Sequence, residues 1–296
     1  MMNERRLVLD TNAFRGLRRK EVEELAGRGF TFVVSEIALS EAMAASVREF
    51  EAGRPRDRAR GLFFKRAKLF ARYVDPEYPV AVAGGHAIER IRNATTGVFD
   101  ADSENAKHAE HLRQVWHVLV GIELLDEEWI SAGHEAERWL AHLDAELQSL
   151  ARREAELWNG VPDEIAEKRA GWLALSEEER LGHLREYLLS TWAFDEAMTD
   201  RLDGHTRFFA WRLHQAALGR EMTKENDAAD LRFIVHLGEG FLLLSGDASF
   251  VRLVDESGTH QAPWVRRLQD LDDPLPDGPP WGGSAHEAAR AFRRGS

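Results

Sequence analysis

Short apolar runs alternate with polar segments of helical spacing near both ends of the chain. Residues 5–9, 30–34 and 241–245 have the length of strands and are largely apolar; the first contains the apolar run at 7–9 and the third the run at 241–244. Runs as short and as apolar as these are typical of strands that are buried on both faces of a parallel sheet. Residues 13–25 and 36–50 follow the first two runs with amphipathic helical patterns. The pattern therefore predicts an α/β fold with a parallel sheet.

The same alternation continues toward the C-terminus. We expect a helix over residues 226–240, a short helix over 248–254 and a last edge strand over 259–265. Ser35 stands directly before the helix at 36–50. A serine hydroxyl in this position can accept a hydrogen bond from a free backbone N–H group, so we expect Ser35 to be the N-cap.

The middle of the chain keeps only the helical spacing. Leu140, Leu143 and Leu147 lie three and four residues apart with charged residues among them, and similar spacing recurs in the segments around them. Such spacing indicates amphipathic helices. We therefore expect residues 53–220 to form a large α-helical insertion, which opens with a loop over residues 53–61.

The insertion divides the predicted core into two segments, residues 1–52 and 221–265. Residues 266–296 are expected to form a tail rich in Pro and Gly that ends in a short basic helix. The expected architecture is thus one α/β core interrupted by helices, and not two α/β domains in succession.

The composition excludes several classes of site. The 296 residues include no cysteine, so the chain has no disulfide, no thiolate nucleophile and no cysteine-based zinc site. No apolar stretch approaches the roughly 20 residues needed to cross a bilayer, and the polar N-terminus does not resemble a secretory signal. We expect a cytoplasmic protein that is not associated with a membrane.

The charge is unevenly distributed along the chain. A formal net charge of −12 argues against a protein that coats nucleic acid non-specifically. Residues 48–72 depart from this balance, because they include nine Lys and Arg residues against three acids. The predicted contacts to a nucleic-acid backbone within this stretch are Arg54, Arg56, Arg58, Arg60, Lys65 and Arg66. A solvated helix face beside a loop is the alternative interpretation.

Acidic residues follow two of the predicted strands, although more than two hundred residues separate them. Asp10 ends the first apolar run, and Asp247 comes shortly after the third. In an open α/β sheet the ligand crevice lies beyond the carboxyl ends of the strands, so we expect these acids to meet. Glu41 lies early in the helix at 36–50, and Asp227 and Asp230 share one face at the start of another helix. Carboxylates gathered in this way predict a divalent metal site, because they would otherwise repel one another.

Four segments resemble the motifs of PIN-domain nucleases. The sequence LVLDTN at residues 7–12 is similar to the opening strand motif of that family, and VSEIALSE at 34–41 resembles its second motif. Residues 226–230 (NDAAD) and 241–250 (FLLLSGDASF) are similar to the third and fourth motifs. The resemblance covers roughly residues 5–50 and 222–265 and leaves the insertion and the tail outside it.

The resemblance implies a Rossmann-like, PIN-type three-layer sandwich that binds Mg²⁺ or Mn²⁺ and hydrolyses phosphodiester bonds in RNA. Members of the family include bacterial toxins and RNA-processing endoribonucleases, and some of them dimerise. By resemblance, the catalytic metal ligands would be Asp10, Glu41, Asp227 or Asp230, and Asp247. Asn12 and Ser245 would orient those ligands through hydrogen bonds.

Several alternatives remain open from the sequence. The spacing to Asp247 favours Asp230 as the third ligand, whereas the pair Asn226-Asp227 is more similar to the family motif. An inactive PIN-like scaffold that binds a protein partner would keep the same fold. A DNA-directed nuclease that uses the insertion as an arch over a single strand is the other alternative to a ribonuclease.

Overall fold

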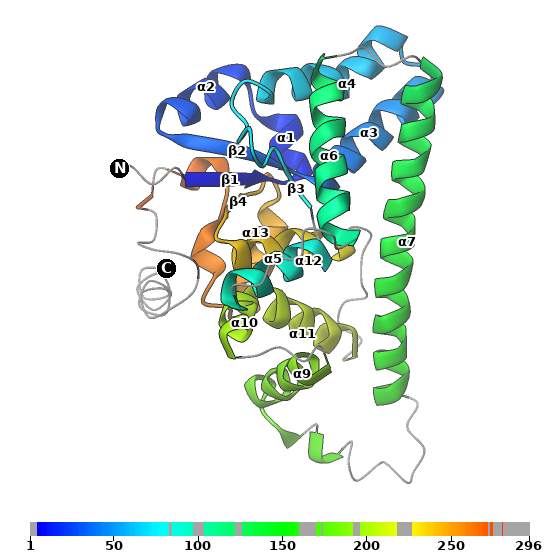
Figure 1. Ribbon diagram of the computed structural model, residues 1–296. Coiled ribbons are helices and arrows are strands. Elements are labelled where there is room, and N and C mark those ends of the chain that lie inside the picture. Colours follow the sequence, from blue (N-terminus) through cyan, green and yellow to red (C-terminus); the bar gives the residue numbers. More distant parts are fainter. Residues whose placement is uncertain are drawn as a thin grey trace.

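A five-stranded parallel sheet forms the centre of the molecule (Figure 1). The computed structural model describes residues 5–82, 85–96, 104–121, 126–159, 170–172, 174–191, 196–217, 227–271, 273–274 and 280. The strands, in the spatial order β3-β2-β1-β4-β5, are β1 (Arg5–Leu9), β2 (Phe30–Ser35), β3 (Val80–Ala81), β4 (Leu242–Leu244) and β5 (Val265–Arg266). The predicted α/β class with a parallel sheet is confirmed.

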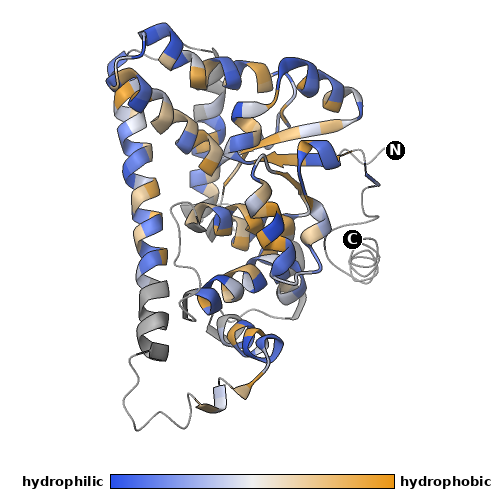
Figure 2. Cartoon of the chain, turned by 180° about the vertical axis from the view of Figure 1, so that it is seen from behind, coloured by the Kyte–Doolittle hydropathy of each residue, from blue (hydrophilic) through white to orange (hydrophobic). Residues whose placement is uncertain are grey.

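Helices lie on both sides of this sheet (Figure 1). In chain order, the first six helices are α1 (Thr11–Gly16), α2 (Arg19–Gly27), α3 (Glu36–Glu51), α4 (Arg56–Phe70), α5 (Gly85–Thr96) and α6 (Glu104–Gly121). They are followed by α7 (Asp126–Asn159), α9 (Glu177–Thr191), α10 (Glu196–Arg201), α11 (Asp203–Ala217), α12 (Asp227–Ile234) and α13 (Ala248–Glu256). Short 3₁₀ turns are η2 (Val235–Glu239), η3 (Ala262–Trp264) and η4 (Leu268–Asp270). The strands are hydrophobic and the outer helix faces hydrophilic (Figure 2), as a sheet covered on both sides requires.

Two predicted elements differ from the structure near the N-terminus. The helix expected over residues 13–25 is two helices, because Leu17 and Arg18 between them have extended backbones. The buried side chain of Leu17 joins the core at this break. The loop expected over residues 53–61 is also wrong, because only a few residues separate α3 from α4. Pro55 precedes the first turn of α4, where proline starts a helix without loss of a hydrogen bond.

The C-terminal elements are shorter than predicted. The helix expected over residues 226–240 becomes η2 after Ile234, and Gly240 ends it with a φ of 92°. The expected edge strand at 259–265 is reduced to β5, because residues 262–264 form the turn η3. The predicted N-cap is confirmed, since the Ser35 hydroxyl accepts a hydrogen bond from the Ala38 N–H group at 3.0 Å. The basic helix expected at the end of the tail lies outside the described residues.

The sheet extends into the range that was expected to be entirely helical. β3 pairs with β2 through Val80 and Ala81, which lie within residues 53–220. Helix α4 also belongs to the layer that covers the sheet, because Phe70 packs against Phe14 and Phe32 at ring distances of 5.3 and 5.4 Å. The helices that stand apart from the sheet therefore begin beyond β3.

The long helix α7 packs along α3 (Figure 1). The indole N–H of Trp129 donates a hydrogen bond to the Ser46 hydroxyl at 2.9 Å, and both side chains are buried. Gly133 permits the close approach of the two helices, since a Cβ there would lie 2.3 Å from a methyl carbon of Val47. This packing fixes the insertion against the helix that carries Glu41.

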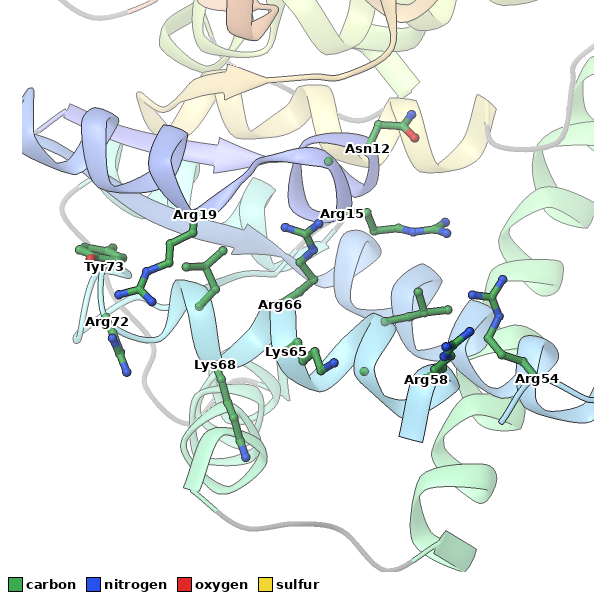
Figure 3. A pocket seen from close by; sticks show the side chains of 14 residues that line it. Asn12, Arg15, Arg19, Arg54, Arg58, Lys65, Arg66, Lys68, Arg72 and Tyr73 are labelled. Carbon is green, nitrogen blue, oxygen red and sulfur yellow. The ribbon is translucent and has the colours of Figure 1, made fainter. Parts of the chain in front are cut away.

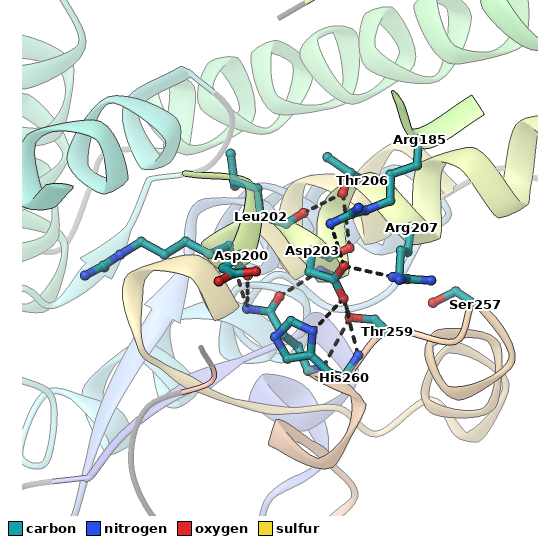
Figure 4. A network of polar contacts seen from close by, with 12 residues as sticks. Arg185, Asp200, Leu202, Asp203, Thr206, Arg207, Ser257, Thr259 and His260 are labelled. Carbon is teal, nitrogen blue, oxygen red and sulfur yellow. Dashed lines mark hydrogen bonds and ion pairs between the residues drawn. The ribbon is translucent and has the colours of Figure 1, made fainter. Parts of the chain in front are cut away.

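A buried polar network joins α9, α11 and the segment before β5 (Figure 4). The Asp203 carboxylate pairs with Arg185 at 3.0 Å and with Arg207 at 2.8 Å. Its other oxygen accepts a hydrogen bond from the Thr259 hydroxyl at 2.7 Å and lies 3.0 Å from the His260 ring. The network therefore ties the end of the insertion to the C-terminal part of the core.

Among the described helices, none combines the length and the apolar character needed to cross a bilayer.

Candidate active site

The site lies where the order of the sheet reverses direction. From β1 the chain proceeds outward to β2 and β3, whereas β4 pairs with the other side of β1 and leads to β5. At such a switch point a crevice is expected at the carboxyl edge of the sheet, beyond the ends of β1 and β4. A cavity of about 150 Å³ occupies this position, and its lining includes Asp10, Glu41, Asp230 and Asp247. Four of the five predicted acids are thus brought together.

Asp10 is held in the cavity by neutral donors. It is the N-cap of α1, and its Oδ1 accepts a hydrogen bond from the Ala13 N–H group at 2.6 Å. Its Oδ2 accepts a hydrogen bond from the Ser245 hydroxyl, and the Gly246 N–H group lies 3.2 Å from both oxygens. Burial raises the pKa of Asp10 and the charge of Asp247 raises it further, against the lowering by these hydrogen bonds. The carboxylate is thus oriented by neutral donors, and none of the described residues forms an ion pair with it.

Glu41 reaches the same cavity from the second turn of α3. Its Oε2 accepts a hydrogen bond from the Thr11 hydroxyl, which stands next to Asp10 in sequence. Burial raises the pKa of Glu41, the Thr11 hydroxyl lowers it, and the charges of Asp10 and Asp144 raise it again. Two carboxylates with raised pKa values therefore lie close enough to repel each other.

Asp247 is fixed by the start of α13. Its Oδ1 accepts hydrogen bonds from the Ser249 and Phe250 N–H groups at 2.7 and 3.3 Å. Its own N–H group donates to the Ser245 hydroxyl at 3.0 Å. Ser245 therefore contacts both Asp10 and Asp247, so one buried hydroxyl fixes the positions of the two strand-end acids.

The other predicted residues are placed as follows. Asp230 lines the cavity from α12, and Asp227 is the first residue of that helix, with a side chain outside the described part of the structure. Asn12 lines the cavity and packs tightly on Gly246, where a Cβ would lie 2.7 Å from the Asn12 Cβ. This close approach brings the loops after β1 and β4 together.

The donor set of the cavity fits a hard divalent cation. Its oxygens belong to carboxylates with hydroxyl groups beside them, and carboxylate oxygens are ligands that Mg²⁺ and Mn²⁺ prefer. The buried guanidinium of Arg212 also lines the cavity. In their present rotamers, no three Asp, Glu or His side chains of the described ranges form a ready set of metal ligands. In this arrangement the hydroxyls of Thr11 and Ser245 donate hydrogen bonds to Glu41 and Asp10.

Two residues near the acids were missed by the sequence analysis. Asp144 of α7 and Glu41 line an adjoining cavity of about 600 Å³. Arg212 of α11 lines the acidic cavity itself and is only 2% exposed. Both lie on helices of the insertion, and their surrounding sequence is that of ordinary amphipathic helices. No local pattern distinguishes them, because only the packing of the insertion brings them to the core.

The basic residues predicted from the sequence separate into two sets. Arg54, Arg58, Lys65 and Arg66 line one groove of about 1010 Å³. Arg56 and Arg60 do not line it, because both pair with Asp126 of α7 at 2.7 Å. The groove also contains Arg15, Arg19, Lys68 and Arg72, which were not among the predicted contacts.

Comparisons of the chain with protein-family models, with curated proteins and with solved structures find no match in any of the three. The functional interpretation therefore depends on the chemistry of the cavity, the groove and the sheet that positions them.

Proposed function

We propose that this protein is a metal-dependent nuclease that hydrolyses phosphodiester bonds in RNA on a Rossmann-like, PIN-type fold. The observation that carries the proposal is the convergence of Asp10, Glu41, Asp230 and Asp247 on one cavity at the topological switch point. These acids come from four separate elements, so their meeting is a property of the fold and not of local sequence.

The residues of the cavity would hold Mg²⁺ or Mn²⁺ through Asp10, Glu41 and Asp247, with Asp227 or Asp230 as a further ligand. When bound, such a cation supplies an activated water and stabilises the leaving oxygen of an in-line displacement. Ser245 keeps Asp10 oriented, and the N–H groups at the start of α13 keep Asp247 oriented. Because burial raises the pKa of Asp10, its ionised form gains from a nearby cation.

Cleavage of short labelled RNA and DNA strands with Mn²⁺ tests the proposal. The wild type should cut RNA, and Asp10→Asn should reduce the rate by more than about 100-fold, beyond the range typical of residues that only orient ligands. Asparagine is as good an N-cap as aspartate, so α1 should stay intact. Asp255→Asn, which changes an exposed acid of α13, is the matched control and should cut at the wild-type rate.

The outcomes separate the alternatives. Equal cleavage by the wild type and by Asp10→Asn would identify a contaminating nuclease and contradict the proposal. Cleavage of DNA but not RNA would assign the same site to a DNA-directed nuclease.

An inactive scaffold that binds a protein partner is the second candidate. The observation in its favour is that Asp10, Glu41 and Asp247 accept hydrogen bonds from hydroxyl or amide groups, while the described ranges contain no ready set of metal ligands. Failure of the wild type both to bind Mn²⁺ and to cleave either strand would favour this candidate.

A further inference from the structure

A basic groove runs beside the acidic cavity, between α4 on one side and α1 and α2 on the other (Figure 3). Arg15 and Arg19 line it from the first two helices. The segment around α4 contributes Arg54, Arg58, Lys65, Arg66, Lys68 and Arg72. No acidic side chain is among the described residues that line the groove. In a chain with a net charge of −12, this is a local reversal of sign.

Helix α4 presents different charges on its two sides. Arg58 and Lys65 are spaced seven residues apart, which places them on the same side of α4, and Arg72 follows shortly after the end of that helix. Arg56 and Arg60 lie on the other side and pair with Asp126. Internal ion pairs therefore neutralise the side of α4 that faces α7 and leave the groove side positive.

Most cations of the groove have no acidic partner within the described part of the chain. Arg19 pairs with Glu23 at 2.7 Å, and Arg54 pairs with Glu49 at 2.5 Å. The others make no ion pair with any described residue; they are Arg15, Arg58, Lys65, Arg66, Lys68 and Arg72. Like charges held side by side without anions raise the affinity for an external polyanion.

Arg66 illustrates this excess at the centre of the groove. Its guanidinium donates a hydrogen bond to the Leu17 carbonyl, which fixes its direction. Burial lowers the pKa of Arg66 and the charge of Arg15 lowers it further, against a raising effect of the charge of Glu21. The two guanidiniums thus repel each other, and a phosphate between them would relieve the repulsion.

The floor of the groove is not purely charged. Leu62, Leu69 and Tyr73 line it and are partly buried. A basic track combined with apolar and aromatic surface is the arrangement by which proteins bind single strands, whose bases are free to pack on such surfaces. A duplex would present only phosphates and sugars to this floor, so the single strand is the better match.

The groove is connected to the acidic cavity. Asn12 lines both, and Arg15 lines the groove and also the neighbouring cavity that contains Glu41. The 15 residues of α4 extend over about 22 Å at the rise of an α-helix. A strand that lies along α4 can therefore pass Arg15 and Asn12 and reach the acids.

We propose that this groove binds single-stranded nucleic acid by its phosphates and delivers the strand to the acidic cavity from the α4 side. Delivery for cleavage rests on the proposed nuclease function, whereas the binding itself does not. Arg58 and Lys65 contact phosphates, and Arg56, two residues from Arg58, does not.

Binding of a short, unstructured, labelled RNA in a chelating buffer tests the groove without catalysis. The full chain is compared with the double variant Arg58→Ala, Lys65→Ala over a salt series from about 50 to 200 mM. Each lost phosphate contact should reduce the log–log salt slope by about 0.7 and weaken binding about fivefold at 0.1 M salt. Arg56→Ala removes a charge from the same helix and should leave the slope unchanged.

Three results would overturn the proposal. The first is an unchanged slope in the double variant, which would assign the groove to another partner such as an acidic protein. The second is an equal loss in Arg56→Ala, which would indicate an effect of net charge alone. The third is tighter binding of a duplex of the same length. Groove-dependent binding without cleavage in Mn²⁺ would support the groove and contradict the nuclease function instead.

Discussion

Ser245 is the residue on which the geometry of the site depends most. It is fully buried at the end of β4, where its hydroxyl donates to Asp10 and accepts from the Asp247 N–H group. A hydroxyl has one proton to donate and lone pairs to accept, so a single side chain can orient both acids. Alanine could fill the same space but could make neither hydrogen bond.

Replacement of Ser245 by alanine should therefore affect stability and catalysis together. We expect a loss of about 1–3 kcal/mol in the free energy of unfolding, because buried polar groups lose a partner, and a 10–100-fold slower cleavage, roughly the range for residues that orient ligands. Ser257→Ala is the control, since its buried hydroxyl donates to the Val254 carbonyl. That variant should lose similar stability in urea unfolding but keep its cleavage rate; equal effects on cleavage would contradict the role of Ser245.

Replacement of Asp10 by asparagine should raise the stability of the fold, in contrast to the replacement of Ser245 by alanine. Burial raises the pKa of Asp10 above its ordinary value of 3.8, so its stabilising contribution is present below that value and is lost as the pH rises through the folded-state pKa. At neutral pH the ionised carboxylate therefore destabilises the metal-free fold. Asp10→Asn should raise the Tm at pH 7, and the difference from the wild type should shrink on acidification. A lower Tm of the variant at pH 7 would show that the charge stabilises the fold.

The contact between helices α3 and α7 holds the insertion on the core. Gly133 of α7 lies against Val47 of α3 so closely that a Cβ would come within 2.8 Å of the Val47 Cβ. A Cβ position cannot move without its backbone, so α7 would have to shift. The same helix carries Asp144 toward Glu41.

Gly133→Ala measures this packing directly. Alanine favours a helix by about 1 kcal/mol over glycine, but overpacking typically costs about 1–3 kcal/mol, and we expect the steric effect to exceed the propensity. The variant should unfold at lower urea concentration than the wild type. Gly182→Ala in α9, with no atom within 4 Å of the added Cβ, should instead gain stability. A gain in both variants would indicate that α7 does not pack tightly on α3.

The elements that the sequence predicted well are those with local signals. β1 and β2 contain short apolar runs, and Ser35 can be predicted as an N-cap from its residue type and its position before the helix. β3 has only two residues and pairs through the existing edge of β2, so no periodicity could reveal it. Pro55 favours the prediction of a loop over residues 53–61, because proline interrupts a helix. In the structure Pro55 stands directly before α4 and marks the start of that helix.

At the scale of the whole molecule, Asp203 joins parts of the chain that are distant in sequence. Burial raises the pKa of Asp203, but the His260 hydrogen bond and the charge of Arg207 lower it well below its ordinary value. The stabilisation is therefore present above the unfolded-state pKa and is lost as the pH falls toward the folded-state pKa. The contact closes the insertion onto the segment before β5.

Asp203→Asn should destabilise the fold by about 3 kcal/mol, because removal of one partner leaves buried charges without compensation. The loss should be full at pH 7 and smaller at pH values below about 4, where the Asp203 carboxylate of the unfolded wild type begins to protonate while that of the folded protein is still ionised. Urea unfolding of both proteins at several pH values measures it. A difference that grows on acidification would contradict the assigned pKa shift.

The site was predictable to the extent that its residues lie at strand ends. Asp10 and Asp247 follow β1 and β4, and the rule that parallel strands present their carboxyl ends together was enough to expect their meeting. Arg212 and Asp144 come from the insertion, so their approach depends on tertiary packing that no local pattern encodes. The sequence predicted that residues 48–72 are basic. Which of these cations line the groove depends on the side of α4 that each one faces, and this is known only from the structure.

Calorimetric titration with Mn²⁺ is the most direct test of the central claim that the converging acids hold a divalent cation. The wild type should bind with saturation and show a raised Tm, because a ligand at about 100 times its Kd stabilises the native state by about 2.7 kcal/mol. Asp247→Asn should lose most of this binding, and Asp255→Asn should keep it. Binding that is equal in all three proteins, or absent from the wild type, would contradict the account.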